Sequence, residues 1–195
     1  DPSNPDSDGD GLKDGDEVNN WTTKPLKIDS DFDGIDDGTE TINCIYGEDE
    51  NECTDPIDDD SDNDGLEDGD EVNNWTTNPK DTDTDDDGLS DSTEVNNCVY
   101  GEDENGCTSP INPDTDLDGL EDGDELIEGT DPMDTDSDDD GLSDGYEINN
   151  CVYGEDENEC TSPNIADSDG DTLPDGDELI EGTDPMDTDT DDDGI

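Results

Sequence analysis

Apolar side chains are sparse along this chain and recur at a fixed place in a twelve-residue pattern. Acidic residues occupy positions 1, 3, 5, 9 and 12 of the pattern, glycine usually occupies position 6, and a branched aliphatic residue occupies position 7. Between position 12 and the next proline there is room for only one or two helical turns. The pattern predicts an irregular fold with short helical turns, in which position 7, an aliphatic at position 13 and the two tryptophans form small local clusters.

The pattern is complete in seven copies, which we number loops 1 to 7. They span residues 6–17, 29–40, 60–71, 83–94, 114–125, 136–147 and 167–178, and an eighth copy begins at Asp189 and reaches its seventh position at Ile195. Their spacing alternates between 22–23 and 31 residues, so the repeating unit is a pair of loops. Repetition of this kind predicts a quasi-linear array.

We expect a single continuous array over residues 1–195, with loop pairs at approximately 6–59, 60–113, 114–166 and 167–195. Because the chain starts in one phase of the repeat and stops inside another loop, we expect it to be a piece of a longer array. Every connector between loops ends in Thr-x-Pro, with the proline four residues before the next loop. Proline fixes its own φ and restricts the residue before it, so this motif predicts a defined direction into each loop.

Composition alone predicts a disordered polymer. The 195 residues include 70 Asp or Glu and only 4 Lys or Arg, which gives a formal net charge of -66, and hydrophobic residues make up 22%. Such a chain cannot bury enough apolar surface to offset the entropy lost on folding. Four cations also cannot form the basic face that binding to nucleic acid or an anionic membrane requires. No apolar run is long enough for a transmembrane helix or a signal peptide.

Six cysteines at one repeated spacing argue against plain disorder. They form the pairs Cys44/Cys53, Cys98/Cys107 and Cys151/Cys160, which predicts three local disulfides and an extracellular, secreted or cell-surface location. The Trp connectors align with the Cys connectors once the residues between the cysteines are removed. Because a disulfide holds Cα atoms about 5.5 Å apart, close to the 3.8 Å of adjacent residues, we expect each bridge to close a small hairpin without redirecting the main chain.

The acidic positions have the chemistry of a calcium loop. Aspartates at positions 1, 3 and 5 place hard oxygens around one point, glycine at position 6 permits a sharp turn, position 7 offers a carbonyl, and Glu at position 12 can bind bidentately. The absence of His and the wide cysteine spacing argue against zinc or copper, and magnesium prefers fewer protein ligands. The sequence therefore predicts at least one Ca²⁺ per complete loop.

Three calcium-loop families share the start of this pattern. The EF-hand and the dockerin place the aliphatic at position 8 and continue into a longer helix, whereas here it stands at position 7 and position 10 is Gly in six of seven copies. The sequence instead resembles the thrombospondin type 3 repeat, particularly its prokaryotic form, over essentially the whole chain. The resemblance implies an extended, solenoid-like rod of calcium-wrapped tandem loops with little regular secondary structure, in which ions replace a core, and more than one ion per repeat.

The carboxylates at the matching positions, with the position-7 carbonyls, are the implied ligands. They are Asp6, Asp8, Asp10, Leu12, Asp14, Glu17; Asp29, Asp31, Asp33, Ile35, Asp37, Glu40; Asp60, Asp62, Asp64, Leu66, Asp68, Glu71; Asp83, Asp85, Asp87, Leu89, Asp91, Glu94; Asp114, Asp116, Asp118, Leu120, Asp122, Glu125; Asp136, Asp138, Asp140, Leu142, Asp144, Glu147; Asp167, Asp169, Asp171, Leu173, Asp175, Glu178; and Asp189, Asp191, Asp193. The chain departs from the family in its cysteine spacing and at Thr172, which replaces the position-6 glycine and predicts either a strained turn or a more weakly bound ion in loop 7.

Two non-enzymatic functions fit these features. Catalysis is not expected, because every carboxylate pair belongs to a repeated loop and there is no His or phosphate-binding glycine loop. The array is expected to be a calcium-stiffened spacer, stalk or filament element, which further copies of the chain extend end to end. The alternative is an adhesive or receptor-binding segment whose Cys hairpins are the contact surface. Asn20 and Asn74 lie in glycosylation sequons, and their use stays open.

Overall fold

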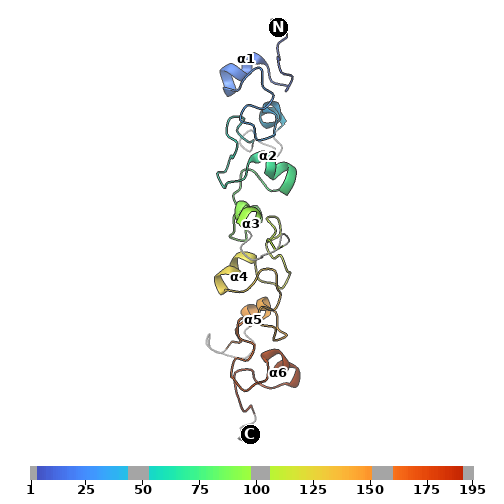
Figure 1. Ribbon diagram of the computed structural model, residues 1–195, viewed down its shortest axis with the longest axis vertical. Helices are drawn as coiled ribbons and strands as arrows, with labels where there is room; N and C mark the ends of the chain where they lie inside the picture. The colour runs from blue at the N-terminus through green and yellow to red at the C-terminus, as the bar shows by residue number, and fades with distance from the viewer. Residues whose placement is uncertain (1–3, 44–52, 98–105, 151–159, 191–195) are drawn as a thin grey trace. The chain divides into compact units, whose positions relative to one another are not determined.

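The computed structural model of the chain describes residues 4–43, 53–97, 106–150 and 160–190, in which short helices alternate with irregular segments (Figure 1). Residues 1–84 with 90–96 form one compact unit, and residues 85–89 with 97–195 form a second unit. Every complete loop ends in a short helix that begins between positions 9 and 11 of the loop. The irregular, repeated architecture with short helical turns was predicted from the sequence.

The helices differ in length and type. They are α1 (Asp14–Asp16), continued by the π-helical turn η1 (Glu17–Trp21); η2 (Thr39–Asn43); α2 (Asp68–Asp70), continued by η3 (Glu71–Trp75); α3 (Asp91–Asn97); α4 (Asp122–Glu128); α5 (Asp144–Asn150); and α6 (Asp175–Glu181). Within the described ranges, the β pairing consists of two isolated antiparallel bridges, Ser109 with Asn112 and Ser162 with Ile165. The described residues contain no helix with both the length and the apolar character needed to cross a membrane.

Each loop is closed by the aspartate at position 9. In loop 1 the Asp14 N–H donates to the Pro5 carbonyl at 2.9 Å, and the Asp14 carboxylate accepts the Ser7 N–H at 2.7 Å and the Ser7 hydroxyl at 2.8 Å. The same three bonds recur in all seven complete loops, at 2.5–3.1 Å. Position 2 is Ser or Thr in every copy, so the loop is closed by a hydroxyl and an amide on one carboxylate.

The buried interior is mostly acidic. Among the described hydrophobic residues, four position-7 side chains are buried, at 5–6% exposure: Leu12, Ile35, Leu66 and Leu120. The largest fully buried side chains are the seven position-12 glutamates, at 0–1% exposure. The expected clusters around the tryptophans are incomplete, since Val18 is 60% exposed and Trp21 and Trp75 are both 41% exposed. Apolar burial therefore contributes little to this fold, and the state of the buried carboxylates decides its stability.

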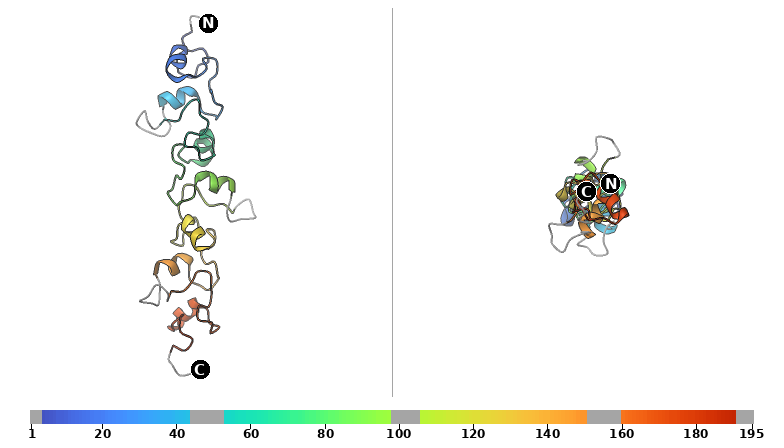
Figure 2. Two further views of the ribbon diagram at one scale, coloured as in Figure 1. Left: turned by 90° about the vertical axis from the view of Figure 1, so that its left-hand side faces the viewer. Right: turned by 90° about the horizontal axis from the view of Figure 1, so that it is seen from below.

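Figure 2 shows the short helices and the irregular segments of the chain from two further sides. Consecutive loops within a unit pack through the residue at position 10. A Cβ added to Gly69 in loop 3 would overlap the Asp33 carbonyl oxygen of loop 2, and the pairs Gly38/Asp10, Gly123/Asp87, Gly145/Asp118 and Gly176/Asp140 show the same close approach. In loop 4 the residue is Ser92, whose N–H and hydroxyl donate to the Asp64 Oδ2 and carbonyl oxygen at 2.8 and 2.6 Å. Glycine at position 10 therefore lets one loop rest on the backbone of the loop before it.

Alanine at position 10 should lower the stability of the protein only in loops whose position-10 glycine packs against the preceding loop. We expect Gly69→Ala to destabilise the calcium-loaded protein by about 1–3 kcal/mol, the usual cost of overpacking. Gly15 is the matched control, because a Cβ there meets nothing within 4 Å and alanine is the better helix former. Denaturant unfolding of both variants in saturating calcium measures the difference, and equal stability of the two would contradict the packing described above.

Position 6 of each loop requires a left-handed backbone. The six glycines at this position have φ between +96° and +105°, and Thr172 in loop 7 has φ of +88°. A β-branched residue is sterically strained in this region. The strained turn predicted for loop 7 is therefore present in the structure.

Candidate metal centre

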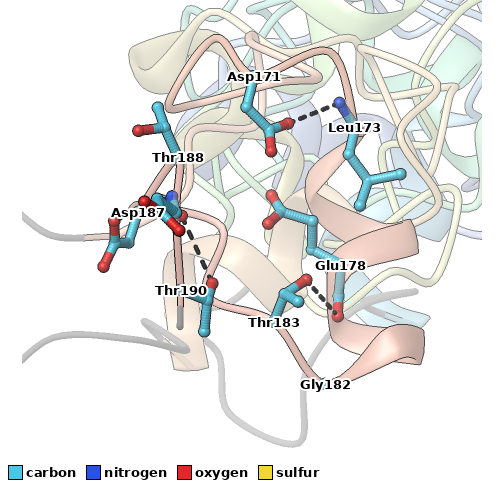
Figure 3. Close-up of a pocket in the computed structure, with 9 residues that line it drawn as sticks. Asp171, Leu173, Glu178, Gly182, Thr183, Asp187, Thr188 and Thr190 are labelled. Carbon is cyan, nitrogen blue, oxygen red and sulfur yellow. Dashed lines mark hydrogen bonds between the residues drawn. The ribbon is translucent and has the colours of Figure 1, made fainter. Parts of the chain in front are cut away.

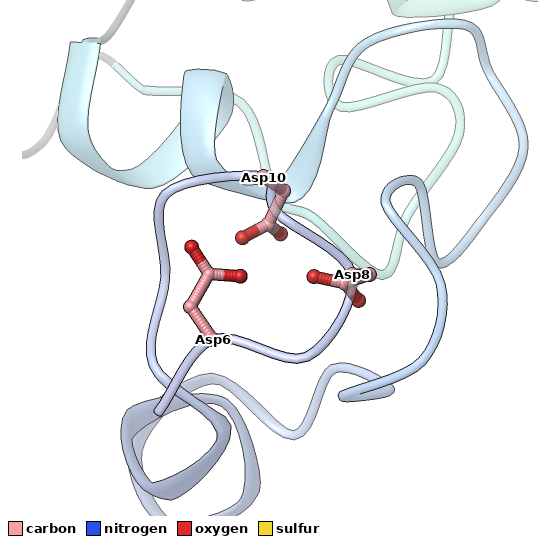
Figure 4. A group of neighbouring side chains, drawn as sticks. All are labelled: Asp6, Asp8 and Asp10. Carbon is pink, nitrogen blue, oxygen red and sulfur yellow. The ribbon is translucent and has the colours of Figure 1, made fainter. Parts of the chain in front are cut away.

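The aspartates at positions 1, 3 and 5 converge on one point. One carboxylate oxygen each of Asp6, Asp8 and Asp10 lies within 4.8 Å of the other two, and the three side chains point toward one another across the loop (Figure 4). The corresponding aspartates of loops 2 and 3 form the same groups, Asp29/Asp31/Asp33 and Asp60/Asp62/Asp64. We refer to these as loop groups.

Backbone hydrogen bonds orient these carboxylates. The Gly9 N–H donates to Asp6 Oδ1, and the Leu12 N–H donates to Asp10 Oδ1, both at 2.7 Å. The bond from position 7 to position 5 recurs in every complete loop, at 2.6–2.8 Å. Asp10 Oδ2 and both oxygens of Asp8 are buried with no hydrogen-bond partner. Each loop therefore fixes its carboxylates through one set of oxygens and leaves another set buried inside.

A second kind of group joins consecutive loops. One oxygen each of Asp10 and Glu17 of loop 1 and of Asp37 of loop 2 lie within 4.8 Å of one another, and Asp33, Glu40 and Asp68 form the equivalent group between loops 2 and 3. Glu17 and Asp37 are both 0% exposed, and Glu17 Oε2 is buried with no hydrogen-bond partner. We refer to these as junction groups, and position 5 belongs to both kinds.

The structure thus distributes the predicted ligands over two groups. Positions 1, 3 and 5 come together within a loop, whereas position 9, as in Asp37, lies with positions 5 and 12 of the preceding loop. The position-7 carbonyls stay a prediction as ligands. In the eighth copy Asp189 is described, and Asp191, Asp193 and Ile195 lie outside the described residues.

Burial changes the acidity of these carboxyl groups. Desolvation, reinforced by neighbouring carboxylates, raises the pKa of Glu17 to about 7, of Glu71 to about 8 and of Glu40 to about 9. The same causes raise the pKa of Asp33 to about 7, and of Asp62 to about 6. A cation bound in these groups would favour the ionised carboxylates and so oppose these shifts.

In loop 7, the acidic residues at positions 5 and 12 line the same pocket. Asp171 and Glu178 line a pocket of about 390 Å³ together with Thr183 and Asp187 (Figure 3). The Leu173 N–H donates to Asp171 Oδ1 at 2.8 Å, and the Thr183 hydroxyl donates to the Glu178 carbonyl at 3.3 Å. Glu178 Oε2 is buried with no hydrogen-bond partner. Carboxylate and hydroxyl groups therefore line this pocket together with Leu173 and Gly182.

This donor set fits a hard cation. Buried carboxylates without a hydrogen-bond partner are strongly unfavourable unless a cation pairs with them. The sequence has only 4 Lys or Arg for 70 acids, so most of these groups have no side-chain cation. Several carboxylate oxygens in a flexible arrangement are the ligands that Ca²⁺ prefers.

The other predicted sites are only partly described. Cys53, Cys107 and Cys160 lie within the described residues, whereas Cys44, Cys98 and Cys151 lie outside them, so the disulfides and their hairpins stay predictions. Asn20 and Asn74 are exposed, and their side-chain amides donate to Asp16 and Asp70 at 3.2 and 2.7 Å. Their glycosylation also stays a prediction.

Sequence comparison identifies the repeat. A family model described as bacterial TSP3 repeat matches residues 6–27, 60–82, 83–97, 114–135, 136–150 and 167–188. These segments contain six of the seven complete loops. No curated protein matches the chain.

Proposed function

Because the chain belongs to the bacterial TSP3 repeat family, we propose that it is an extracellular calcium-binding array that acts as a calcium-stiffened spacer, stalk or filament element. The observation that carries this proposal is the set of buried position-12 glutamates, each next to carboxylates of its own loop. Such an interior is unstable without cations, and with them it becomes a set of cross-links along the chain.

The two kinds of group support about two ions per loop. An ion in a loop group orders the backbone of one loop, and an ion in a junction group joins two loops. The second kind is the one that would stiffen the array, because its ligands come from both sides of a connector. Seven ions, one for each complete loop, would reduce the net charge from -66 to -52, so further ions also relieve repulsion between the remaining acids.

A spacer role agrees better with the repetition than a unique binding or catalytic site does. Each carboxylate group recurs from loop to loop, so we propose no catalytic role. The adhesive alternative depends on the Cys hairpins, whose central residues lie outside the described ranges. Assembly with further copies of the chain stays a prediction that electron microscopy with and without calcium would test.

The shared position 5 gives a test of the ion count. We expect Asp10→Asn to lose about two calcium ions, because Asp10 belongs to a loop group and a junction group, and Asp6→Asn to lose about one. Both changes are isosteric, and in the first variant the side-chain amide oxygen can still accept the Leu12 N–H. Native mass spectrometry at calcium concentrations near half saturation counts the ions.

Two outcomes would contradict the proposal. Absence of bound calcium in the unmodified chain would exclude the function itself. If Asp10→Asn and Asp6→Asn lost the same number of ions, calcium binding would stand, but the proposed ion in the junction group would be refuted. Asp16→Asn is the control. Asp16 stands at position 11, outside the positions that form the loop groups and the junction groups, so this variant should bind the full number of calcium ions.

A further inference from the structure

Threonines in the connectors contact the position-12 glutamates. The hydroxyl of Thr77 donates to Glu71 Oε1 at 3.0 Å, and both side chains are 0% exposed. Glu71 Oε2 is buried with no hydrogen-bond partner. Thr54 makes the same bond to Glu40 at 3.0 Å, and the bonds of Thr23 to Glu17 and Thr130 to Glu125 are longer, at 3.4 Å. Each of these threonines begins a Thr-x-Pro motif, and we call them the connector threonines.

The residue after each connector threonine forms a hydrogen bond with the next loop. Its N–H donates to the position-2 hydroxyl, which in turn donates to the position-9 aspartate. The Asn78 N–H donates to Thr84 Oγ1 at 2.9 Å, and the Thr84 hydroxyl donates to Asp91 Oδ2 at 2.6 Å. The equivalent bonds lead from Lys24 through Ser30 to Asp37, from Asp55 through Ser61 to Asp68, and from Asp131 through Ser137 to Asp144, at 2.6–3.2 Å.

The position-12 glutamate and the position-9 aspartate that these hydrogen bonds connect lie close to each other. At the first junction they are Glu17 and Asp37, and these two carboxylates lie together with Asp10 in a junction group. Glu17 and Asp37 thus each have one oxygen held by a Thr or Ser hydroxyl, and one oxygen of each of the three acids lies within 4.8 Å of the other two. Hydrogen bonds from neighbouring residues commonly orient metal ligands in this way and raise metal affinity.

We propose that the connector threonine and the position-2 hydroxyl are positioning residues for the cation of the junction group, and that they link calcium binding in one loop to the geometry of the next. This inference rests on the proposed calcium-binding function. The threonine hydroxyl fixes one oxygen of the glutamate and thereby directs the other toward the ion. The position-2 residue holds both oxygens of the aspartate of the following loop through its N–H and its hydroxyl, as Ser30 does for Asp37, and so fixes the orientation of that carboxylate.

The junction between loops 3 and 4, which contains Thr77, allows calcium binding to be followed at a single site. Each of the two tryptophans follows one position-12 glutamate by four residues. In a Trp21→Phe background, Trp75 reports calcium binding near Glu71, and in a Trp75→Phe background, Trp21 reports binding near Glu17. We expect Thr77→Val to raise the calcium midpoint of Trp75 fluorescence about tenfold and to leave the Trp21 midpoint unchanged. Native mass spectrometry of the same variants at intermediate calcium should show the loss of about one ion.

The controls separate positioning from packing. Thr77→Ser keeps the hydroxyl and should restore the midpoint to within about twofold. Thr76→Val is the matched control, because Thr76 is the adjacent, exposed residue; expression without N-glycosylation avoids an effect on the Asn74 sequon. Thr84→Val should weaken binding in the same direction, and the double variant should be non-additive, because the two hydroxyls hold Glu71 and Asp91 and both of these carboxylates interact with Asp64.

Each result decides between the alternatives. A shift for Thr77→Val with rescue by Thr77→Ser supports the proposal. Equal shifts for Thr77→Val and Thr77→Ser would assign Thr77 a packing role and overturn it, as would an unchanged midpoint and ion count in Thr77→Val. Failure of the parent chain to bind calcium by mass spectrometry would refute the proposed function rather than the role of the threonines.

Discussion

Removing calcium with excess chelator near pH 7.5 is expected to abolish most of the helical circular dichroism of this chain and to expand its hydrodynamic radius. The four buried position-7 side chains of the described residues cannot hold the chain together, and seven glutamates with at most 1% exposure would be left without cations. At calcium near 2 mM and dissociation constants near 0.1 mM, mass action supplies about 1.8 kcal/mol per site. Over seven loops, this is comparable to the whole stability of a typical domain, about 5–15 kcal/mol.

The control for this experiment separates binding from screening. Sodium chloride at matched ionic strength weakens repulsion between the acids but cannot bridge the buried carboxylates, so it should not restore the signal, whereas added calcium should. Magnesium should restore it less completely, because it retains its water and prefers fewer protein ligands. An unchanged spectrum and radius after chelation would mean that contacts other than ions stabilise the fold.

The roles of positions within one loop could be predicted from the sequence. Aspartates at alternating positions, a sharp turn at position 6 and one or two helical turns before the next proline are all local features, determined by residues a few positions apart. Thr172 illustrates this, because a β-branched residue at a left-handed position is recognisable from the register of the repeat alone and has φ of +88° in the structure. The convergence of Asp6, Asp8 and Asp10 is local in the same way.

The division of the acids into two groups could not be predicted, because it depends on how consecutive loops pack. Asp37 was expected to be a calcium ligand, and it lies with Asp10 and Glu17 of the loop before it. The packing that brings it there uses the close approach of Gly38 to the Asp10 carbonyl, a contact between residues 28 positions apart. Its signal in the sequence was the recurrent glycine at position 10, which a single loop does not explain.

The hydroxyl at position 2 is the functional residue that the sequence reading missed. It is Ser or Thr in every copy, a regularity as strict as that of the aspartates, although neither residue is a preferred calcium ligand. Its role becomes clear only once position 9 is known to accept both its N–H and its hydroxyl, as Asp37 does from Ser30 at 2.7 Å. Residues that orient ligands are therefore visible in a repeat by their regularity, and their partners come from the structure.

The acidity of the buried carboxyls predicts opposite effects of pH on the loaded and the metal-free protein. Burial raises the pKa of the position-12 glutamates, to about 7 for Glu17 and about 8 for Glu71 and Glu125. Calcium must displace these protons, so its affinity should fall as the pH drops from about 8 to 5, by about tenfold per pH unit for each proton displaced. Calorimetry in buffers of different ionisation enthalpy counts the protons released per ion.

In the metal-free protein, lowering the pH should have the opposite effect, because it should stabilise the folded state. The folded state binds more protons than the unfolded state between the ordinary glutamate pKa of 4.5 and the raised values near 8, so its stability falls as the pH rises through this window. We therefore expect metal-free protein to regain helical circular dichroism near pH 4 and to lose it by about pH 8. Glu71→Gln, which cannot ionise, should weaken the pH dependence, whereas the exposed Glu67→Gln should not. A metal-free helical signal that increases with pH would show that these glutamates are not buried in the absence of calcium.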